Sequence, residues 1–220
     1  KKVIEIIKEI KKISKNCTIC AGNIATGKAA KFLADAGADI VKVGIGPGSI
    51  CTTRLVTGIG VPQLSAVLDV KKSLKNYKVK IISDGGIKFS GDIAKALAAG
   101  ADAVMIGSLF SGTTESPGKT FKYKGTLYKN FRGMGSAGAM SAGSADRYFQ
   151  KKSKNISKFV AEGVEGIVKF KGPVNKIIYQ LIGGLKSSMG YMGSKKINDL
   201  QKKCEFVKIT KAGFYESMVH

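Results

Sequence analysis

The sequence predicts an α/β fold of the β/α-barrel class, and three observations support this expectation. Short apolar segments alternate with helical patterns along residues 1–110, which is typical of a parallel sheet covered by helices. Each apolar segment ends in a glycine-containing loop with polar residues, as expected where the carboxyl ends of parallel strands form an active face. Only four such units are visible, whereas a closed barrel has eight. We therefore expect about the second half of a longer (β/α)8 barrel.

The elements of this first part follow from apolar periodicity and glycine placement. Apolar residues three and four apart predict helices, which cover about 1–13, 26–36, 63–75 and 90–99. Near-continuous apolar runs predict buried strands, which cover about 18–24, 40–44, 79–86 and 103–108. Gly37 and Gly100 are each expected to end a helix, because glycine adopts the left-handed conformation of a helix end at little cost.

The pattern changes after residue 110. A hairpin is expected at 121–128, around Lys124 and Gly125. The stretch 132–159 is rich in glycine, serine, alanine and lysine and has little apolar periodicity. Such a stretch is typical of a lid or of a disordered segment. We interpret it as a mobile flap.

The C-terminal part is expected to be mainly helical. Periodicity predicts helices over about 174–189 and 194–203, and a strand-like run at 206–209 leads to the tail. One domain then has three parts: βα units in 1–110, the hairpin and mobile flap in 111–173, and closing helices with a C-terminal segment in 174–220.

Length and composition limit the class of protein. With 220 residues, of which 44% are hydrophobic, the chain can bury the core of about one domain. No apolar run approaches the roughly 18 residues of a membrane span, and the amphipathic N-terminal pattern does not resemble a signal peptide. A cytoplasmic protein without a membrane partner is expected.

The cysteines do not predict a disulfide framework. Only four occur, and they are widely scattered: Cys17, Cys20, Cys51 and Cys204. Cys17 and Cys20 form a C-x-x-C pair, but neither a second pair nor a nearby histidine accompanies it. We interpret this pair as the entrance to a strand rather than as a zinc or redox site.

The net charge of +22 allows two interpretations. The lysines could neutralise the phosphates of a nucleic acid, or they could form the surface of an enzyme that attracts anionic substrates. They are spread through every helical pattern, and no basic tract or nucleic-acid recognition motif occurs. The second interpretation is favoured, so no specific nucleic-acid partner is expected.

A tight loop, with the sequence GIGPGSICTTR from Gly44 to Arg54, presents Cys51. Its glycines and proline disfavour a helix and most strand pairing, so the loop delivers the cysteine to a defined position. A cysteine in such an accessible loop, near Arg54, can act as a thiolate nucleophile. The alternative is a small buried cysteine that only packs.

Two further strand ends have the composition of a phosphate site. Asp84-Gly85-Gly86 and Gly107-Ser108 follow successive strands, and backbone amides at such loops bind phosphate in β/α barrels. Asp84 only accepts hydrogen bonds when it is ionised, so it suits a pair of sugar hydroxyls. Ordinary turn chemistry with a helix cap is the alternative.

Four segments carry a more specific signal. They read GIGPGSICTTR, ISDGGIKFSGDIAKALAAGADAVMIGSLFSGTTESPG, RGMGSAGAM and SADRYFQ. Together they closely resemble the family of inosine-5′-monophosphate (IMP) dehydrogenase and its sister enzyme guanosine monophosphate (GMP) reductase. The resemblance runs through essentially all 220 residues and corresponds to the C-terminal half of that family's catalytic TIM barrel.

The resemblance implies an activity, the NAD-dependent oxidation of IMP to xanthosine monophosphate (XMP) in guanine nucleotide biosynthesis. The implied route passes through a covalent thioimidate on Cys51 (E-XMP*), which is hydrolysed with the help of a flap pair, Arg147 and Tyr148. This pair favours the dehydrogenase over GMP reductase, an NADPH-dependent deamination, which stays an alternative. A noncatalytic nucleotide- or RNA-binding fragment is another. The isolated chain is expected to be inactive or poorly folded.

The resemblance also implies the residues of the active site. Thr53 and Glu162 would add a second proton route to the catalytic set of Cys51, Arg147 and Tyr148. Phe131 stands where a tyrosine often contacts the phosphate. Contacts to IMP are implied for Ser49, Asp84, Gly86, Gly107, Ser108, Gly133, Met134, Gly135 and Glu162.

Two further ligands are implied in the same way. The nicotinamide side of NAD would lie against Asn23, Gly44 and Gly46. A K⁺ ion would be bound by carbonyl oxygens and would hold the cysteine loop in shape. Its ligands would be Gly46, Gly48 and Cys51, together with Glu216, Ser217 and Met218 of a neighbouring subunit in a homotetramer.

Overall fold

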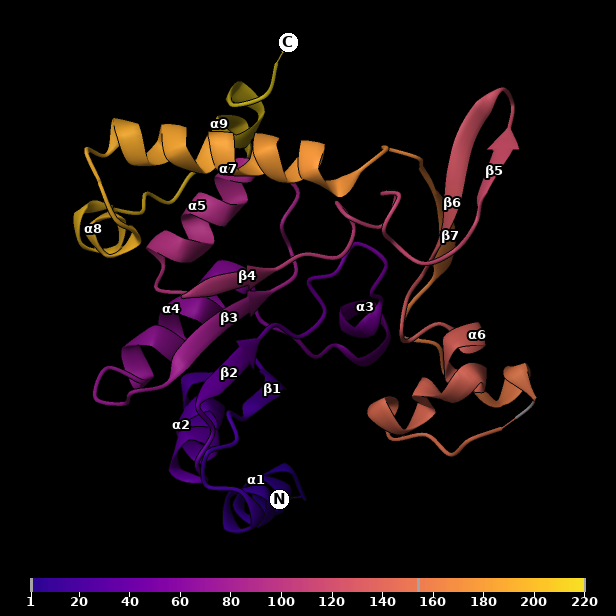
Figure 1. Ribbon diagram of the computed structural model, residues 1–220, viewed down its shortest axis with the longest axis horizontal. Helices are drawn as coiled ribbons and strands as arrows, with labels where there is room; N and C mark the ends of the chain where they lie inside the picture. Colours follow the sequence, from indigo (N-terminus) through magenta and orange to yellow (C-terminus); the bar gives the residue numbers. More distant parts are fainter. Residues whose placement is uncertain (1, 154, 220) are drawn as a thin grey trace.

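The computed structural model describes residues 2–153 and 155–219. Its first part is a parallel sheet with the strand order β1-β2-β3-β4 (Figure 1). The predicted α/β class with a parallel sheet is confirmed, because each strand lies within a predicted segment. The strands are β1 (Cys20–Ile24), β2 (Ile40–Val43), β3 (Lys80–Asp84) and β4 (Ala103–Met105).

Helices cover one face of this sheet and enclose the core. The core includes Val41, Val43 and Ile81 from the strands and Val67 and Val70 from a helix, all at most 1% exposed. These are the positions at which apolar periodicity predicts contact between helix and sheet. The covering helices are α1 (Lys2–Ile13), α2 (Gly27–Asp35), α4 (Gln63–Ser73) and α5 (Ser90–Ala98).

The opposite face of the sheet is open. Successive side chains of a strand point to opposite faces, so Val41 and Ile81 are buried against helices while Lys42 and Ile82 are only half-buried. Met105, on the same open face, is 42% exposed. In a closed eight-stranded barrel this face would line the packed interior. The described residues form four parallel strands and do not close a barrel.

A second sheet has three antiparallel strands, β5 (Thr120–Tyr123), β6 (Thr126–Arg132) and β7 (Glu165–Lys169). The predicted hairpin is confirmed: Lys124 and Gly125 form its turn with φ values of 46° and 80°, as a two-residue hairpin turn requires. Strand β7 was not predicted, because its short run follows an irregular segment and its partner β6 lies far earlier in the chain.

The segment between β6 and β7 is more regular than its composition predicts. The expectation of an unstructured lid was wrong, because Met140 and Ala145 are fully buried and give the segment a small core of its own. Its turns are too short for apolar periodicity to be visible. They are α6 (Ala137–Ala139), the π-helical turn η1 (Met140–Ser144) and the 3₁₀ turns η2 (Ala145–Tyr148) and η3 (Ile156–Lys158).

The C-terminal part consists of α7 (Val174–Tyr191), α8 (Ile197–Lys203) and α9 (Lys211–Glu216). Helix α7 lies across α5 (Figure 1), where Leu181 and Leu185 pack against the buried residues of α5. The strand expected at 206–209 is wrong: in the described structure this run is irregular and pairs with neither sheet. No described helix is long and apolar enough to cross a bilayer.

Gly184 permits the close approach of α7 to α5. A Cβ atom at Gly184 would collide with Cβ and Oγ of Ser90, at the start of α5. We expect Gly184→Ala to lower the free energy of unfolding of the complete protein by about 1–3 kcal/mol, measured by denaturant titration. In a Ser90→Gly background the same substitution should cost less than half as much. An equal cost in both backgrounds would contradict this packing.

Candidate functional site

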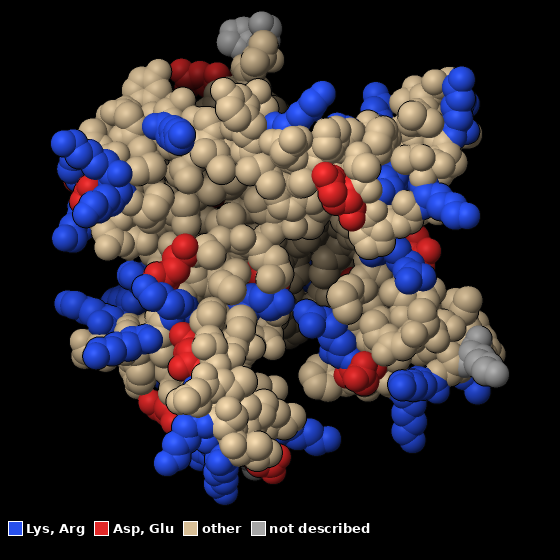
Figure 2. Space-filling view, viewed as in Figure 1, with Lys and Arg blue, Asp and Glu red and all other residues tan. Residues whose placement is uncertain are grey.

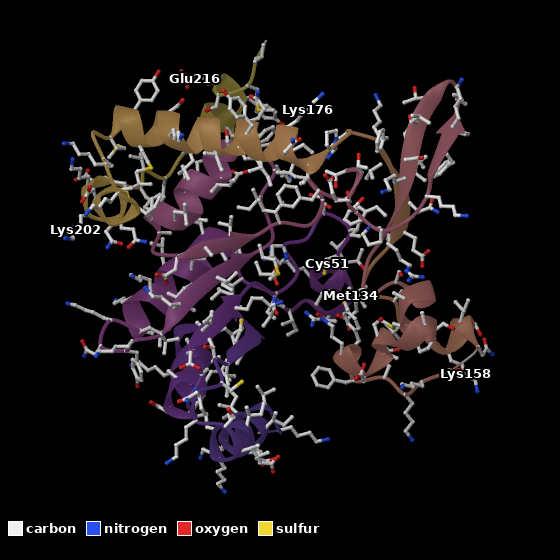
Figure 3. The ribbon with its side chains drawn as sticks, viewed as in Figure 1. Cys51, Met134, Lys158, Lys176, Lys202 and Glu216 are labelled. Carbon is white, nitrogen blue, oxygen red and sulfur yellow. The ribbon has the colours of Figure 1, made fainter. Side chains whose placement is uncertain are left out.

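A cavity of about 260 Å³ lies where the carboxyl ends of β3 and β4 face the end of β6. Figure 2 shows the surface hollowed near the middle of the molecule, where Figure 3 places Cys51 and Met134. The cavity brings together most of the residues predicted to act on a substrate. In its wall are Ser49, Cys51, Asp84, Gly86, Gly107, Ser108, Gly133, Met134, Gly135, Tyr148 and Glu162.

The loop that presents Cys51 is braced by Arg54, from the short helix α3 (Thr53–Thr57). The guanidinium donates from Nε to the carbonyl of Ile45 at 2.9 Å and from Nη2 to that of Val61 at 2.6 Å. A Cβ atom at Gly46 would lie 2.7 Å from Cγ of Arg54, so only glycine fits there. Arg54 therefore shapes the loop backbone, which differs from its expected role as a charged neighbour of the thiol.

Cys51 begins a chain of hydrogen bonds that ends on a carboxylate. Its Sγ lies 3.2 Å from Oγ1 of Thr53, and this hydroxyl donates to Oε2 of Glu162 at 2.8 Å. A thiol proton can move along such a chain to the carboxylate, which would leave a thiolate. The structure thus brings together three of the five predicted catalytic residues.

Backbone pairing holds the two ends of this chain together. The N–H of Thr52 donates to the carbonyl of Glu162 at 2.8 Å, and the N–H of Val164 donates to that of Ile50 at 3.0 Å. The N–H of Glu162 in turn donates to the carbonyl of Gly135 at 2.9 Å. The two ends of the flap therefore meet beside the cysteine loop.

The flap places Tyr148 in the cavity wall and leaves Arg147 exposed beside it. A Cβ atom at Gly135 would lie 2.9 Å from Cζ of Tyr148, so the ring packs directly on this glycine. Burial raises the pKa of Tyr148 above its usual value. The charge and hydrogen bond of Arg147 oppose this rise, while Cys51 and Glu162 add to it. Tyr148 is therefore a neutral phenol at neutral pH.

The other end of the cavity is lined with backbone donors. The N–H groups of Gly86, Gly107 and Ser108 have no acceptor among the residues that the structure describes. Unpaired N–H groups at the ends of parallel strands are suited to an anion such as a phosphate. Phe131 closes this end with a ring that offers no hydroxyl.

Asp84 is held in place by two donors at the sheet's open face. Nδ2 of Asn23 donates to its Oδ2 at 2.8 Å, and Nζ of Lys42 lies 3.2 Å from the same oxygen. Neither contact uses Oδ1, which can therefore accept from a ligand hydroxyl. Lys42 was not among the predicted site residues. Its signal was a single charge inside an otherwise apolar strand, Ile40–Val43.

Asn23 and Gly44, predicted on the nicotinamide side, adjoin the cavity without forming its wall. Asn23 donates to the carbonyl of Gly44 at 2.8 Å as well as to Asp84. Its Oδ1 is buried and has no partner among the described residues. A carboxamide N–H, as nicotinamide carries, is the kind of donor that this oxygen needs.

The residues predicted to bind K⁺ are only partly brought together. Gly46, Gly48 and Cys51 share one loop, whereas Glu216 lies over α7, away from Cys51 (Figure 3), and Ser217 and Met218 follow it. In the described part of the chain, no cluster of three histidine, cysteine or acidic side chains could hold a metal. Carbonyl oxygens are thus the donors that the loop offers, and they suit K⁺.

Comparison with curated proteins gives a consistent set of relatives. An IMP dehydrogenase of Rhizobium tropici is 54% identical over 219 residues, which are all of this chain and 44% of that protein. One of Methanocaldococcus jannaschii is 55% identical over 227 residues, again all of this chain and 46% of the relative. The chain therefore spans less than half the length of these relatives.

A solved structure has the same fold. It is GMP reductase C318A from Trypanosoma brucei in complex with guanosine 5′-monophosphate, with a TM-score of 0.89 and 46% identity. The match covers 99% of this chain and 44% of that one. A model of the IMP dehydrogenase / GMP reductase domain matches residues 1–220. The chain, with its cysteine loop and the cavity beside it, belongs to the IMP dehydrogenase / GMP reductase domain family.

Proposed function

We propose that this chain carries the substrate-binding and nucleophilic part of an enzyme that oxidises IMP to XMP with NAD⁺. The hydrogen-bonded chain from Cys51 through Thr53 to Glu162 is the observation that carries the proposal. The curated relatives, named IMP dehydrogenase at 54% to 55% identity, support the same reaction. Because the chain spans less than half of these relatives, the activity is that of the complete protein.

The cavity suits each part of the nucleotide. The unpaired N–H groups of Gly86, Gly107 and Ser108, with the hydroxyl of Ser49, would bind the phosphate. Oδ1 of Asp84 would accept from ribose hydroxyls. The purine would lie between Cys51 and the backbone of Gly133, Met134 and Gly135, with Glu162 beside it.

In the first step the thiol proton of Cys51 passes through Thr53 to Glu162, and the thiolate bonds to C2 of the purine. The hydrogen at C2 leaves with its electron pair as a hydride, and the carbon–nitrogen double bond is restored. NAD⁺, when bound, supplies the acceptor for this hydride. The chain then holds a thioimidate, E-XMP*, through the sulfur of Cys51.

In the second step water attacks C2 and the thiolate of Cys51 leaves, which releases XMP. We propose that Arg147 accepts the proton of this water, and that the neutral phenol of Tyr148 is the hydrogen-bonding partner of Arg147. A guanidinium is normally protonated, so Arg147 must first release a proton to solvent. Arg147 is exposed in this structure, and movement of the flap into a closed, water-poor site would then favour the neutral form. Thr53 and Glu162 offer a second route for the same proton.

The residues that are present suit two groups that the complete protein would bind, NAD⁺ and K⁺. Asn23 would bind the carboxamide of NAD⁺ through its unpaired Oδ1, beside Gly44 and Gly46. The carbonyls of Gly46, Gly48 and Cys51 would bind K⁺, whose charge would keep the loop in shape.

We further propose that the rest of the protein completes both the barrel and these sites. Residues 1–110, 111–173 and 174–220 would form one catalytic domain, and its open sheet face would be covered by the missing strands. Glu216, Ser217 and Met218 would complete the K⁺ site of a neighbouring subunit in a homotetramer. The position of Glu216 away from Cys51 of the same chain is compatible with this role (Figure 3).

GMP reductase is the second candidate, because a solved structure that matches nearly the whole chain carries that name. Incubation of the complete protein with IMP and NAD⁺, and separately with GMP and NADPH, distinguishes the two reactions by the change in absorbance of the reduced cofactor. If the protein turns over neither IMP with NAD⁺ nor GMP with NADPH, and only binds nucleotide or RNA, the alternative of a noncatalytic binding fragment would be supported.

Cys51→Ala should abolish the oxidation, because no covalent adduct can form without the sulfur. We expect kcat to fall by at least about 1,000-fold, measured by NADH formation, with binding of IMP retained. Mass spectrometry of wild-type protein stopped during turnover should show the adduct on Cys51. Substantial activity in the variant would refute the nucleophile.

Arg147→Ala should slow hydrolysis without slowing hydride transfer. Quenched-flow experiments should show a normal burst of NADH, followed by accumulation of E-XMP* and a steady-state rate lower by about 100-fold or more. A slow burst would instead place Arg147 in the first step. Lys151→Ala, which removes an exposed cation of the same segment outside the cavity wall, serves as a comparison.

Phe131→Tyr should strengthen the binding of IMP, because the ring closes the phosphate end of the cavity and lacks a hydroxyl. One added hydrogen bond contributes about 1 kcal/mol, so we expect KM for IMP to fall about fivefold with kcat little changed. Steady-state kinetics measures this change, and an unchanged KM would show that the ring does not face the phosphate.

A further inference from the structure

Lys171 binds the carbonyl side of the turn that follows β4. Its Nζ lies 3.0 Å from the carbonyl oxygen of Leu109 and 3.4 Å from that of Ser108. Lys171 is exposed and lies two residues after the end of β7, an edge strand of the three-stranded sheet. The proposed reaction assigns it no role.

Lys129 binds the next part of the same turn from inside the protein. It is 2% exposed, and its Nζ lies 2.9 Å from the carbonyl oxygen of Thr113 and 2.5 Å from that of Ser116. A buried ammonium group needs several acceptors, and here backbone carbonyls provide them. Lys129 therefore fixes the course of residues 113–116.

The two ammonium groups together determine which backbone groups of residues 107–116 remain available. The carbonyl of Leu109 accepts from Lys171, and that of Ser108 accepts from the hydroxyl of Ser111 at 2.8 Å as well as from Lys171 at 3.4 Å. The carbonyl of Gly107 accepts from the N–H of Phe110 at 3.0 Å. The N–H groups of Gly107 and Ser108, at the cavity wall, keep no partner among the described residues. The two lysines thus bind carbonyls on both sides of the turn, while the N–H groups of Gly107 and Ser108 are left for an anion.

We propose that Lys171 and Lys129 are positioning residues for the 5′-phosphate of the substrate. They hold residues 107–116 so that the N–H groups of Gly107 and Ser108 meet the phosphate, and neither lysine touches it. This inference rests on the proposed function, since it assumes that the cavity binds a purine nucleotide by its phosphate.

Lys171→Met tests the proposal in the complete protein, because it removes the ammonium from an exposed position and preserves most of the side chain. We expect KM for IMP to rise about fivefold to tenfold, with kcat within twofold of wild type. With inosine, which has no phosphate, kcat/KM should be unchanged. Lys171→Arg should restore KM, because a guanidinium also donates to carbonyls.

Lys169→Met is the matched control. It removes an equal charge from the adjacent strand β7, and in the described structure its side chain forms no hydrogen bond or ion pair. An equal effect of Lys169→Met and Lys171→Met, or equal losses with IMP and inosine, would overturn the proposal. Lys129→Met should show the same selective loss of IMP affinity, and if it fails to fold, the Lys171 variants decide alone.

Calorimetric binding of IMP and inosine separates this inference from the proposed function. If wild-type protein turns over neither IMP nor GMP, the proposed function fails. A preference for IMP over inosine that weakens in Lys171→Met would still support the positioning role. Wild-type protein that binds the two with equal affinity would overturn it.

Discussion

The position of the nucleophile depends on one junction between two distant parts of the chain. The loop that ends at Cys51 pairs through its backbone with residues 162–164, which directly follow the flap. This pairing sets the separation between Cys51 and Glu162, because Thr53 spans the gap with hydrogen bonds of ordinary length. Backbone geometry thus places the thiol beside Thr53, and in the described structure its hydrogen-bonding partner is this neutral hydroxyl.

Most of the residues proposed to bind the substrate line one cavity of the described structure. Strands β3 and β4 supply Asp84, Gly86, Gly107 and Ser108, and the end of β6 supplies the residues that would contact the purine. The proposed cofactor side is less complete, since Oδ1 of Asn23 is buried and has no partner among the described residues. This difference follows from topology, because the loops after neighbouring parallel strands lie at one end of the sheet. The open face of the sheet, in contrast, is not covered by the described residues.

Apolar periodicity predicted the parallel strands and the long helices well, because each buries a continuous face. Gly37 and Gly100 end their helices with φ values of 104° and 109°, as expected from glycine alone. Strand β7 and the turns of the flap were missed, because their partners are distant and their apolar runs short. The strand predicted at 206–209 has a strand-like composition, but no sheet edge lies beside it in the described structure.

The residues of the cavity were recovered by motif, while the contacts that orient them were not. Three lysines contact backbone or carboxylate oxygens that lie far from them in sequence, namely Lys42, Lys129 and Lys171. The spacing of residues along the sequence therefore could not predict these partners. The two carbonyls that Arg54 binds, those of Ile45 and Val61, were likewise not predicted, although they lie within nine residues of it.

The hydrogen bond between Gly135 and Glu162 has an evolutionary consequence. It joins the two ends of the segment 136–161. An insertion or deletion within this segment would therefore leave Cys51 and Glu162 in the same relative position. The segment between Gly135 and Glu162 could therefore change in length without displacing the cysteine loop, and the proposed hydrolysis could vary separately from the proposed formation of the adduct.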